Sequence, residues 1–330
     1  MRFLLVTALA TVLVFGGCSR VSSIGDGGTA DADTDGDTDT DSDTDADSDT
    51  DNDTGPVECD LGEYIGDFKI ETQSDVAILA GYTSISGELT INCSSFTDFN
   101  KLSCLTSVGV DLKIHNNEVL TNVTNVDGLN GITSVGHDLS IHNNEALTNL
   151  DGLSGLTSLS GSLWINYNDA LADLDGLSGI TSIGQSLFVG GNPVLTNLAG
   201  LNGITSVSDA LAIESNDALT NLDGLSGITG PLSYWLTITG NDGLTDLDGL
   251  SGIAGSVGWD LRIHNNDALT NLDGLSGIIS VWTGVIVIEN AALPDCEVCE
   301  LLDQLTIEPM GITVHSNLDD SCTPVPANCP

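Results

Sequence analysis

Positive charge is scarce in this 330-residue chain. It contains 6 Lys and Arg residues against 48 Asp and Glu, and its formal net charge is −42. A surface that binds nucleic acid needs clustered Lys or Arg to neutralise phosphates, and a surface that binds anionic lipid needs a polybasic patch. The composition therefore argues against nucleic acid as a partner and against a polybasic contact with membranes.

Aromatic side chains are also few. They make up 4% of the chain, although 40% of the residues are hydrophobic and 38 are glycine. Small and aliphatic residues suit thin layers that repeat along the chain better than one bulky core. The composition therefore favours a repeat architecture over a single globular core.

The apolar run at the start of the chain is too short to span a bilayer as a helix. It extends almost unbroken from Phe3 to Phe15 and follows a positive start at Arg2. These are the features of a secretory signal peptide. We therefore expect the protein to be exported.

The segment Val14-Phe15-Gly16-Gly17-Cys18 resembles the lipobox of bacterial lipoproteins. The resemblance implies that residues 1–17 are a lipoprotein signal peptide and that Cys18 carries the lipid, which anchors the protein to the membrane. Ser19 stands where an Asp would, in some bacteria, favour retention in the inner membrane. We expect a cell-envelope protein that is lipid-anchored in the outer membrane and exposed at the surface. The alternatives are an ordinary signal peptide with an incidental Cys18, or a retained membrane helix.

Residues 18–56 are predicted to form a disordered tether behind the lipid. From Asp31 to Asp53 every second residue is Asp, and no apolar side chain in this run is larger than Ala. Nothing offsets the entropy of ordering such a segment, and its like charges repel. Calcium binding is the alternative, since Asp31-x-Asp33-x-Asp35-Gly36 opens like an EF-hand loop. The twelfth position is Ser42 instead of Glu, and no flanking helices are visible.

The rest of the chain repeats itself. Asp-Gly dipeptides recur every 24 or 25 residues, and Ala199-Gly200 occupies the one slot where the dipeptide is missing. The Asp residues of this column are Asp127, Asp151, Asp175, Asp223, Asp248 and Asp273. Within one unit, Leu147 to Ala170, leucines recur at every third position, and Leu163 and Ile165 then alternate with polar neighbours. That alternation predicts one short strand in each repeat.

The strand signal occurs about nine times. Its apolar pairs are Leu89/Ile91, Leu112/Ile114, Leu139/Ile141, Leu163/Ile165, Leu187/Val189, Leu211/Ile213, Leu236/Ile238, Leu261/Ile263 and Ile286/Ile288. A fixed period with one strand per unit predicts a mostly β solenoid, because each coil buries its apolar edge only by stacking on its neighbours. We assign the solenoid to residues 57–295 and a disulfide-rich C-terminal cap to residues 296–330.

An asparagine stands three residues after the second apolar residue of seven of these strands. The set is Asn117, Asn144, Asn168, Asn192, Asn216, Asn241 and Asn266. A buried Asn in register can bond backbone groups of its own and adjacent coils at a sharp corner. The pattern predicts a structural ladder.

The repeat pattern L-x-I-x-x-N-x-x-L-x-x-L-x-G-L, with I-T-S-V-G before the strand, resembles the receptor L domain. This module is a leucine-rich, right-handed β-helix, and similar repeats occur in bacterial surface lipoproteins with acidic tethers. The resemblance implies the fold over about residues 60–325. It does not imply hormone binding or signalling, because the chain lacks the cysteine-rich domain, transmembrane helix and kinase that accompany those functions.

The ends of the solenoid need caps, because open coils expose strand edges. At the N-terminal side we expect a first strand over Tyr64–Ile70 and a short helix from Ser74 to Leu79. At the C-terminal side we expect a helix from Leu293 to Leu305 and a last strand over Ile312–His315.

The cysteines cluster at these ends. The disulfide candidates are Cys59, Cys93, Cys104, Cys296, Cys299, Cys322 and Cys329. With Cys18 lipidated, these seven leave one unpaired thiol. Cys296 with Cys322 would tie the cap helix to the last strand, and Cys299 with Cys329 is a candidate second bridge. Cys296-x-x-Cys299 alternatively suits a redox pair or half a zinc site, but no second paired motif supports this.

The Asp-Gly column has two interpretations. As a functional feature it is a strip of calcium ligands, and calcium would then be the only cofactor. As a structural feature, which we favour, each Asp caps its own turn by accepting backbone N–H groups and each Gly takes a positive φ. Ala199 fills one slot without breaking the period, which fits independent turns. His115, His142 and His264 share one strand position, and we expect them to be solvated instead of metal-bound.

We expect no catalytic site. Residues 55–330 hold only Lys69, Lys101, Lys113 and Arg262 as Lys or Arg, no break in the repeat marks a cleft, and no Ser-His-Asp arrangement is evident. The predicted function is a surface solenoid that binds an extracellular protein or glycan or mediates adhesion. Trp164, Tyr167 and Phe188 are the candidate contact patch. The alternative is an envelope spacer or scaffold without a specific ligand, with or without calcium.

Overall fold

A computed structural model of the chain describes residues 57–92, 99–117, 128–307 and 311–318. The signal peptide, Cys18, the tether, Asp127, Cys93, Cys322 and Cys329 lie outside the described residues, so the expectations for them stay predictions. Everything below concerns the unit Pro56–Pro330, which contains all the described residues.

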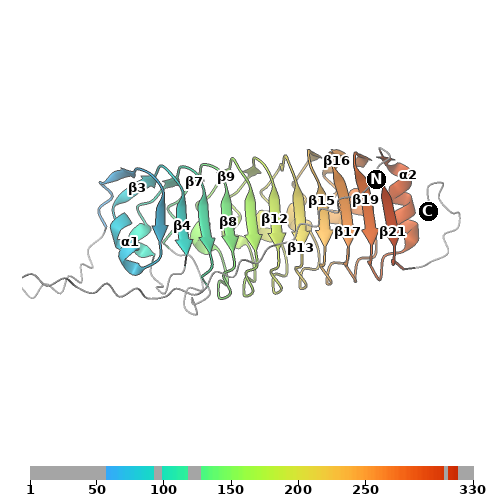
Figure 1. The fold of residues 1–330 in the computed structure, drawn as a ribbon, viewed down its shortest axis with the longest axis horizontal. Helices are drawn as coiled ribbons and strands as arrows, with labels where there is room; N and C mark the ends of the chain where they lie inside the picture. Colours follow the sequence, from blue (N-terminus) through green and yellow to red (C-terminus); the bar gives the residue numbers. More distant parts are fainter. Residues whose placement is uncertain (1–56, 93–98, 118–127, 308–310, 319–330) are drawn as a thin grey trace, which may run out of the picture. The chain divides into compact units, whose positions relative to one another are not determined.

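One parallel sheet runs along the solenoid, and every coil contributes one strand to it (Figure 1). We call it the long sheet. Its eleven strands are, in spatial order, β2 (Phe68–Ile70), β4 (Leu89–Asn92), β6 (Leu112–His115), β8 (Leu139–His142), β10 (Leu163–Asn166), β12 (Leu187–Gly190), β13 (Leu211–Glu214), β15 (Leu236–Thr239), β17 (Asp260–His264), β19 (Gly284–Ile288) and β21 (Ile312–His315). The mostly β solenoid predicted from the repeats is confirmed.

Most coils contribute a second, shorter strand that the sequence did not reveal. One six-stranded parallel sheet contains β1 (Gly62–Tyr64), β3 (Tyr82–Ile85), β5 (Ser107–Val108), β7 (Ser134–Val135), β9 (Ser158–Leu159) and β11 (Ser182–Ile183). A four-stranded sheet contains β14 (Gly230–Leu232), β16 (Ile253–Val257), β18 (Ile278–Val281) and β20 (Thr306–Ile307). Several of these strands have only two residues, which is too short for an alternating pattern to be recognised.

The Asp-Gly segments form single turns of 3-10 helix. They are η2 (Asp151–Leu153), η3 (Asp175–Leu177), η4 (Ala199–Leu201), η5 (Asp223–Leu225), η6 (Asp248–Leu250) and η7 (Asp273–Leu275), and η1 (Asn100–Leu102) precedes them. In every coil the leucine that ends the turn is buried. The turns therefore supply the core with the leucine that follows each Asp-Gly or Ala-Gly pair.

Our expectation for the 3-10 turns was wrong in both details, although Gly128, which follows Asp127 in the same column, does have a positive φ of 97°. The side chain two residues earlier holds the turn, as when Asp223 N–H donates to Asn221 Oδ1 at 3.2 Å. Gly224 has no positive φ, and a Cβ there would lie 1.9 Å from the carbonyl oxygen of Leu198 in the preceding coil. The column needs glycine because successive coils approach too closely for any side chain.

The core follows the predicted inward positions except in the last coil. Val285 and Val287 are fully buried, whereas Ile286 and Ile288 are partly exposed, so the predicted pair Ile286/Ile288 is wrong by one residue. The reason is that Val285-Ile286-Val287-Ile288 is apolar throughout. Such a run has no alternation to fix which residues face inward.

Both ends carry helices, as expected. α1 (Gln73–Leu79) is capped by Thr72 and Asp75, and α2 (Asp295–Gln304) lies at the other end (Figure 1). The first predicted strand is instead two strands, β1 and β2, in different sheets, and Gly66 between them has a φ of 108°. Among the described residues, no helix has the length and apolar character needed to cross a membrane.

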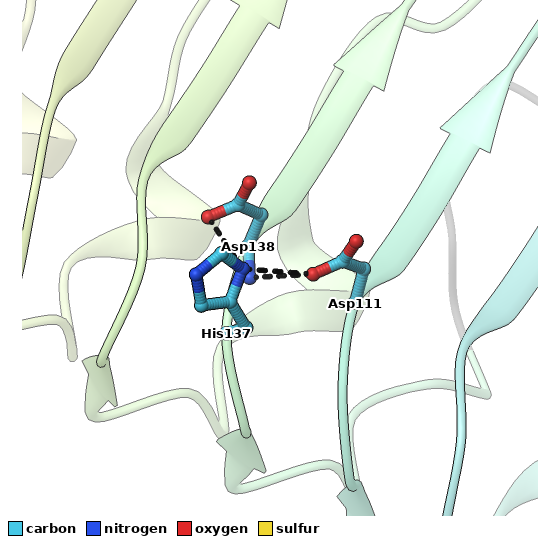
Figure 2. Close-up of side chains that lie close together, drawn as sticks. All are labelled: Asp111, His137 and Asp138. Atoms are coloured by element: carbon cyan, nitrogen blue, oxygen red, sulfur yellow. Dashed lines mark hydrogen bonds and ion pairs between the residues drawn. The ribbon is translucent and has the colours of Figure 1, made fainter.

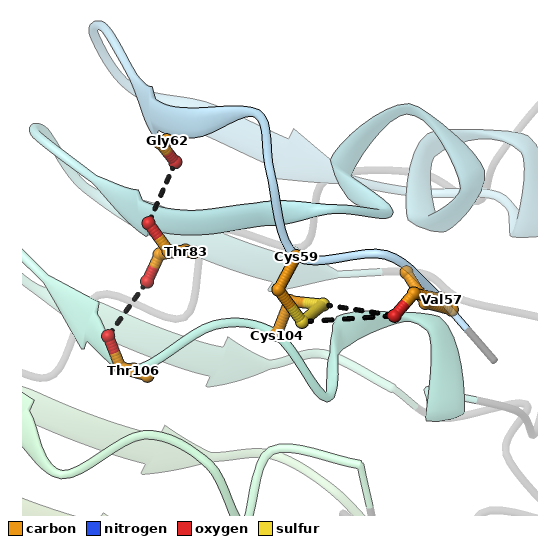
Figure 3. Close-up of a disulfide and its surroundings, with 6 residues drawn as sticks. All are labelled: Val57, Cys59, Gly62, Thr83, Cys104 and Thr106. Atoms are coloured by element: carbon orange, nitrogen blue, oxygen red, sulfur yellow. Dashed lines mark hydrogen bonds between the residues drawn. A yellow bond between two sulfur atoms is a disulfide. The ribbon is translucent and has the colours of Figure 1, made fainter.

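A disulfide joins Cys59 to Cys104 across the first coils, with the Cα atoms 5.3 Å apart (Figure 3). Beside it, Thr106 Oγ1 donates to the carbonyl of Thr83, and Thr83 Oγ1 donates to that of Gly62. Cys296 and Cys299 in α2 are also disulfide-bonded. The hydroxyls of Thr83 and Thr106 and the Cys59–Cys104 disulfide thus connect the N-terminal coils to one another.

Candidate functional site

The predicted asparagines form a continuous buried ladder. Asn216 is representative: its Nδ2 donates to the carbonyl of Val189 and to Asn241 Oδ1, and its Oδ1 accepts from Asn192. The seven predicted members are at most 2% exposed. The ladder satisfies polar groups at the corner after each strand. It is a structural device and leaves the outer face free to vary.

Two further members, Asn290 and Asn317, were missed by the sequence reasoning. Asn290 Nδ2 donates to Asn317 Oδ1 at 3.2 Å and to the carbonyl of Ile263 at 3.0 Å. Each of the two stands three residues after the inward valines Val287 and Val314. The one-residue register error in the last coil therefore concealed them.

The outward face of the long sheet changes character along the solenoid. In the coils of β4 to β8 it carries charged groups, including Lys113, whose Nζ pairs with Glu88 and lies 3.2 Å from Asp111 Oδ2. On β10, β12 and β13 the central outward residues are instead Trp164, Phe188 and Ala212, and aromatic residues also directly precede β15 and β17. This change on one face is the departure from regularity that the sequence did not show.

Five aromatic side chains form one continuous strip on this face, which we call the aromatic strip: Trp164, Phe188, Tyr234, Trp235 and Trp259. Trp164 and Phe188 occupy paired positions on β10 and β12, and their rings stack with centroids 3.8 Å apart. Phe188 leads to Trp235 at 6.4 Å, and Trp235 to Trp259 at 6.1 Å. Tyr234 and Trp259 meet edge to face at 5.3 Å.

Small residues of β13 provide the floor of the strip. Ala212 is paired with Phe188, points outward and is nevertheless 2% exposed, and Ala210 is fully buried. The pair Trp164/Phe188 and the group Tyr234/Trp235/Trp259 are thus connected by the approach of Phe188 to Trp235 beside the small side chains of β13.

The candidate patch predicted from sequence is only partly brought together. Trp164 and Phe188 are in direct contact, but Tyr167 lies in the turn after β10 with a φ of 57°. Its ring lies over Gly191, where a Cβ would come 2.6 Å from Cδ1. Tyr234, Trp235 and Trp259 were missed. The adjacent pair Tyr234-Trp235, one coil before Trp259, was the signal that could have revealed them.

One group among the described residues has three ligand-type atoms within 4.8 Å of one another: Asp111, His137 and Asp138 (Figure 2). His137 Nδ1 lies 3.2 Å from Asp111 Oδ1 and 3.1 Å from Asp138 Oδ1. Asp111 Oδ1 also accepts from Asp138 N–H, and Asp138 Oδ1 from Ser162 N–H at 2.6 Å. These oxygens already bond the adjacent coil.

The electrostatics of this group favour the ionised form of Asp111. Burial raises the pKa of the Asp111 carboxyl, but hydrogen bonds from the Asp138 backbone, Lys113 and His137 lower it further, so the pKa lies below its usual value. Lys113, whose own pKa is raised by its bond to Glu88, already supplies the positive charge. The group functions as a register lock between coils.

The histidines are not simply solvated. His115 and His142 stack with centroids 4.7 Å apart and planes 3° apart, and both are half-buried. Burial and the neighbouring positive charges of His142, Lys69 and Lys113 lower the pKa of His115 to about 4. Burial likewise lowers the pKa of His142 and His264. The three side chains are partly exposed, as expected, but the stacking of His115 on His142 was not predicted.

Asp111, His137 and Asp138, the one group of metal-ligand type among the described residues, do not belong to the Asp-Gly column. Its members from Asp151 to Asp273 are exposed. A second acidic column follows the asparagine ladder, where burial and the charges of Asp267 and Asp217 raise the pKa of Asp242. The carboxylates of this second column repel one another, and no described side chain supplies a counter-ion to them.

The geometry defines a leucine-rich β-solenoid with an aromatic strip on its long sheet. No model of a protein family matches the chain, and no curated protein matches it at a significant level. Among solved structures, it is similar to an internalin from Listeria monocytogenes, with 18% identity over 78% of this chain and 68% of the internalin, at a TM-score of 0.41. The assignment of the fold rests on the strand pairing and the asparagine ladder of the chain itself.

Proposed function

We propose that this protein is a non-catalytic binding or adhesion module, lipid-anchored at Cys18 in the outer membrane and presented at the cell surface on its acidic tether. The observation that carries the proposal is the aromatic strip. Tyr234 and Trp259 are 40% and 52% exposed. Aromatic residues clustered on one rigid face are enriched where proteins bind partners, and scattered surface residues need no such explanation.

The rigidity of the scaffold supports this role. The strands beneath the strip pair in continuous register from β10 to β17, and the buried asparagines fix each corner. Rings held on such a sheet lose little conformational freedom when a ligand binds. The long sheet therefore provides a preorganised surface.

The test combines location with binding. Protease treatment of intact cells should release the solenoid by cleavage in the tether. The full-length chain should bind an extracellular protein or glycan, and the double variant Trp164→Ala/Phe188→Ala should lose that binding. Trp282→Ala is the matched control, because Trp282 is 63% exposed and lies outside the strip. Protection from protease until the outer membrane is opened would contradict the surface role.

A spacer or scaffold is the second candidate, and the unbroken asparagine ladder favours it. A protein that acts only as a rigid spacer should tolerate deletion of any whole coil equally. A binding module should instead be sensitive to deletion of the coils that carry the strip. Comparing deletion of the coil that ends in β12 with deletion of the coil that ends in β8 separates the two functions.

A further inference from the structure

The aromatic strip offers few free polar groups. Ser162 Oγ accepts from Ser186 N–H and Ser186 Oγ accepts from Ala210 N–H, both at 3.3 Å, so the hydroxyls beneath the strip are engaged in the ladder between coils. Ala210, Ala212 and Gly190 fill the neighbouring outward positions. A site that selects sugars needs hydrogen-bonding groups for their hydroxyls. Within the strip such groups are the indole N–H of each Trp and the hydroxyl of Tyr234, because the serine hydroxyls beneath it are engaged.

The ring orientations also disfavour sugar stacking. The planes of Trp164 and Phe188 are 12° apart at a centroid distance of 3.8 Å, so their faces cover each other and their edges point outward. Tyr234 and Trp259 meet edge to face at an angle of 90°, so the edge of one ring covers one face of the other. Outward edges present apolar C–H groups, which suit aliphatic side chains better than a flat sugar ring.

The charges around the strip are acidic. Asp209 precedes β13, and the Tyr234 N–H donates to its carbonyl, which places Asp209 beside the aromatic pair. Glu214 lies on β13, where burial raises its pKa and Arg262 opposes that effect. The Arg262 guanidinium is itself held by Asp260 at 2.6 Å. A partner that reaches the strip therefore meets the carboxylates of Asp209 and Glu214 at its margin, with Arg262 as the nearby cation.

We propose that the partner is a protein segment in which apolar side chains alternate with Lys or Arg. This inference rests on the proposed function and specifies its ligand. The apolar side chains would lie on the ring edges and the alanine floor, and the cations would face Asp209 and Glu214. Tyr234 and Trp259 are 40% and 52% exposed, so they can add cation–π attraction for a Lys or Arg side chain of the partner, and Arg is the more frequent partner in such contacts.

The size of the strip sets the length of the segment. From β10 to β17 the strip crosses four strand-to-strand steps, or about 19 Å at the usual strand spacing of about 4.8 Å. An extended segment of about six residues spans that distance. Anionic polymers are excluded as occupants, because residues 55–330 carry 35 acids and four Lys or Arg.

The experiment uses the full-length chain and three probes at physiological salt. They are a peptide of about twelve residues that alternates Leu and Arg, the same peptide with each Arg replaced by uncharged citrulline, and a neutral β-linked hexasaccharide. Each is titrated against wild type, Trp235→Ala, Trp235→Phe and the control Trp282→Ala. The urea unfolding curve of each variant shows whether it is folded.

We expect the Leu-Arg peptide to bind wild type and Trp282→Ala equally and to lose about tenfold or more in affinity on Trp235→Ala, with partial retention by Trp235→Phe. Replacement of Arg by citrulline should weaken binding to wild type. Equal binding of the citrulline peptide would overturn the cationic partner. Binding of the hexasaccharide through Trp235 would overturn this inference and leave the binding function in place. If no probe distinguishes wild type from Trp235→Ala, both the cationic partner and the proposed binding function of the aromatic strip are overturned.

Discussion

Trp164 and Phe188 stack face to face across β10 and β12, with their ring centroids 3.8 Å apart. The positions that continue this column are Ser140 on one side and Ala212 on the other. Inward positions of the long sheet remain Leu, Ile or Val in every strand from β4 to β19. The inward residues therefore specify the solenoid, and the outward residues give two adjacent coils a distinct surface.

The stack should contribute measurable coupling energy. In a double-mutant cycle, Trp164→Ala and Phe188→Ala should be non-additive by about 1 kcal/mol in the free energy of unfolding, as expected for an aromatic pair in contact. Urea unfolding of the two single variants and the double variant measures this. Additivity within about 0.3 kcal/mol would show that the rings do not interact in solution.

The asparagine ladder should be the costliest polar feature to interrupt. Asn216→Ala removes donors and acceptors at once, and it leaves the carbonyl of Val189 and the N–H of Asn192 without their partner. Each buried group without a hydrogen bond costs about 1–3 kcal/mol, so we expect a loss of about 3 kcal/mol or more.

Asn202→Ser is the matched control for that variant. Asn202 is exposed, and Ser occupies the equivalent position after the other 3-10 turns, for example Ser178. Its unfolding free energy should stay within about 0.5 kcal/mol of wild type. Similar losses for both asparagines would mean that the ladder contributes no special stability.

Sequence reasoning succeeded where a physical requirement repeats in register. Leu163, Ile165 and Asn168 recur because every coil must fill the same inward space and satisfy the same corner. It failed where that signal is absent, as at Val285 and Val287, whose apolar neighbours Ile286 and Ile288 conceal the register.

The aromatic strip was beyond sequence spacing for a different reason. Phe188 lies on β12 and Trp235 directly precedes β15, so β13 with its small outward residue Ala212 separates them in the sheet, and their ring centroids still lie within 6.4 Å. Tyr234 and Trp235 also precede β15 instead of lying within it, so strand periodicity did not predict their direction. Contact of this kind depends on the stacking of coils in space.

The 3-10 turns provide a test of their own construction. Asp223→Ala should change the unfolding free energy by less than about 0.5 kcal/mol, because Ala199 occupies the same position of η4 with the same backbone bond to Asn197. Asn221→Ala should cost about 1 kcal/mol, since Asn221 Oδ1 accepts the first N–H of the turn.

Gly224→Ala should cost more than either, because its Cβ would overlap the carbonyl of Leu198. Gly311→Ala is the control, since a Cβ there meets nothing within 4 Å. Thermal melts with and without a calcium chelator complete the test. A lower melting temperature in chelator that Asp223→Ala abolishes would restore the Asp-Gly column as a calcium site.

The Cys59–Cys104 disulfide should stabilise the N-terminal coils. It closes a loop with a sequence separation of 45, for which the chain-entropy estimate is about 4 kcal/mol. We expect Cys59→Ser/Cys104→Ser to unfold at markedly lower urea concentration than wild type. An unchanged midpoint would indicate that α1 and the first coils are held by packing alone.

Acid should weaken the solenoid through the stacked histidines. The pKa of His115 is lowered from 6.5 to about 4, mainly by burial and then by the positive charges of His142, Lys69 and Lys113, while Glu88 opposes the shift. The unfolded chain therefore binds a proton below about pH 6.5, and the folded chain does so only near pH 4. Stability attributable to His115 is complete above pH 6.5 and is lost as the pH falls toward 4.

His115→Asn isolates this contribution, because Asn92 and Asn166 are native to the same column of the sheet. Near pH 7.5 both proteins carry an uncharged side chain at this position, so that measurement gives the cost of the substitution itself. Between pH 7.5 and pH 5 the unfolding free energy of the variant should fall by on the order of 1–2 kcal/mol less than that of wild type. Other groups, including the Asp111 carboxyl with its lowered pKa, titrate in both proteins and cancel in the comparison. Urea unfolding at the two pH values gives the difference. Parallel losses in the two proteins would show that the His115–His142 stack does not resist protonation.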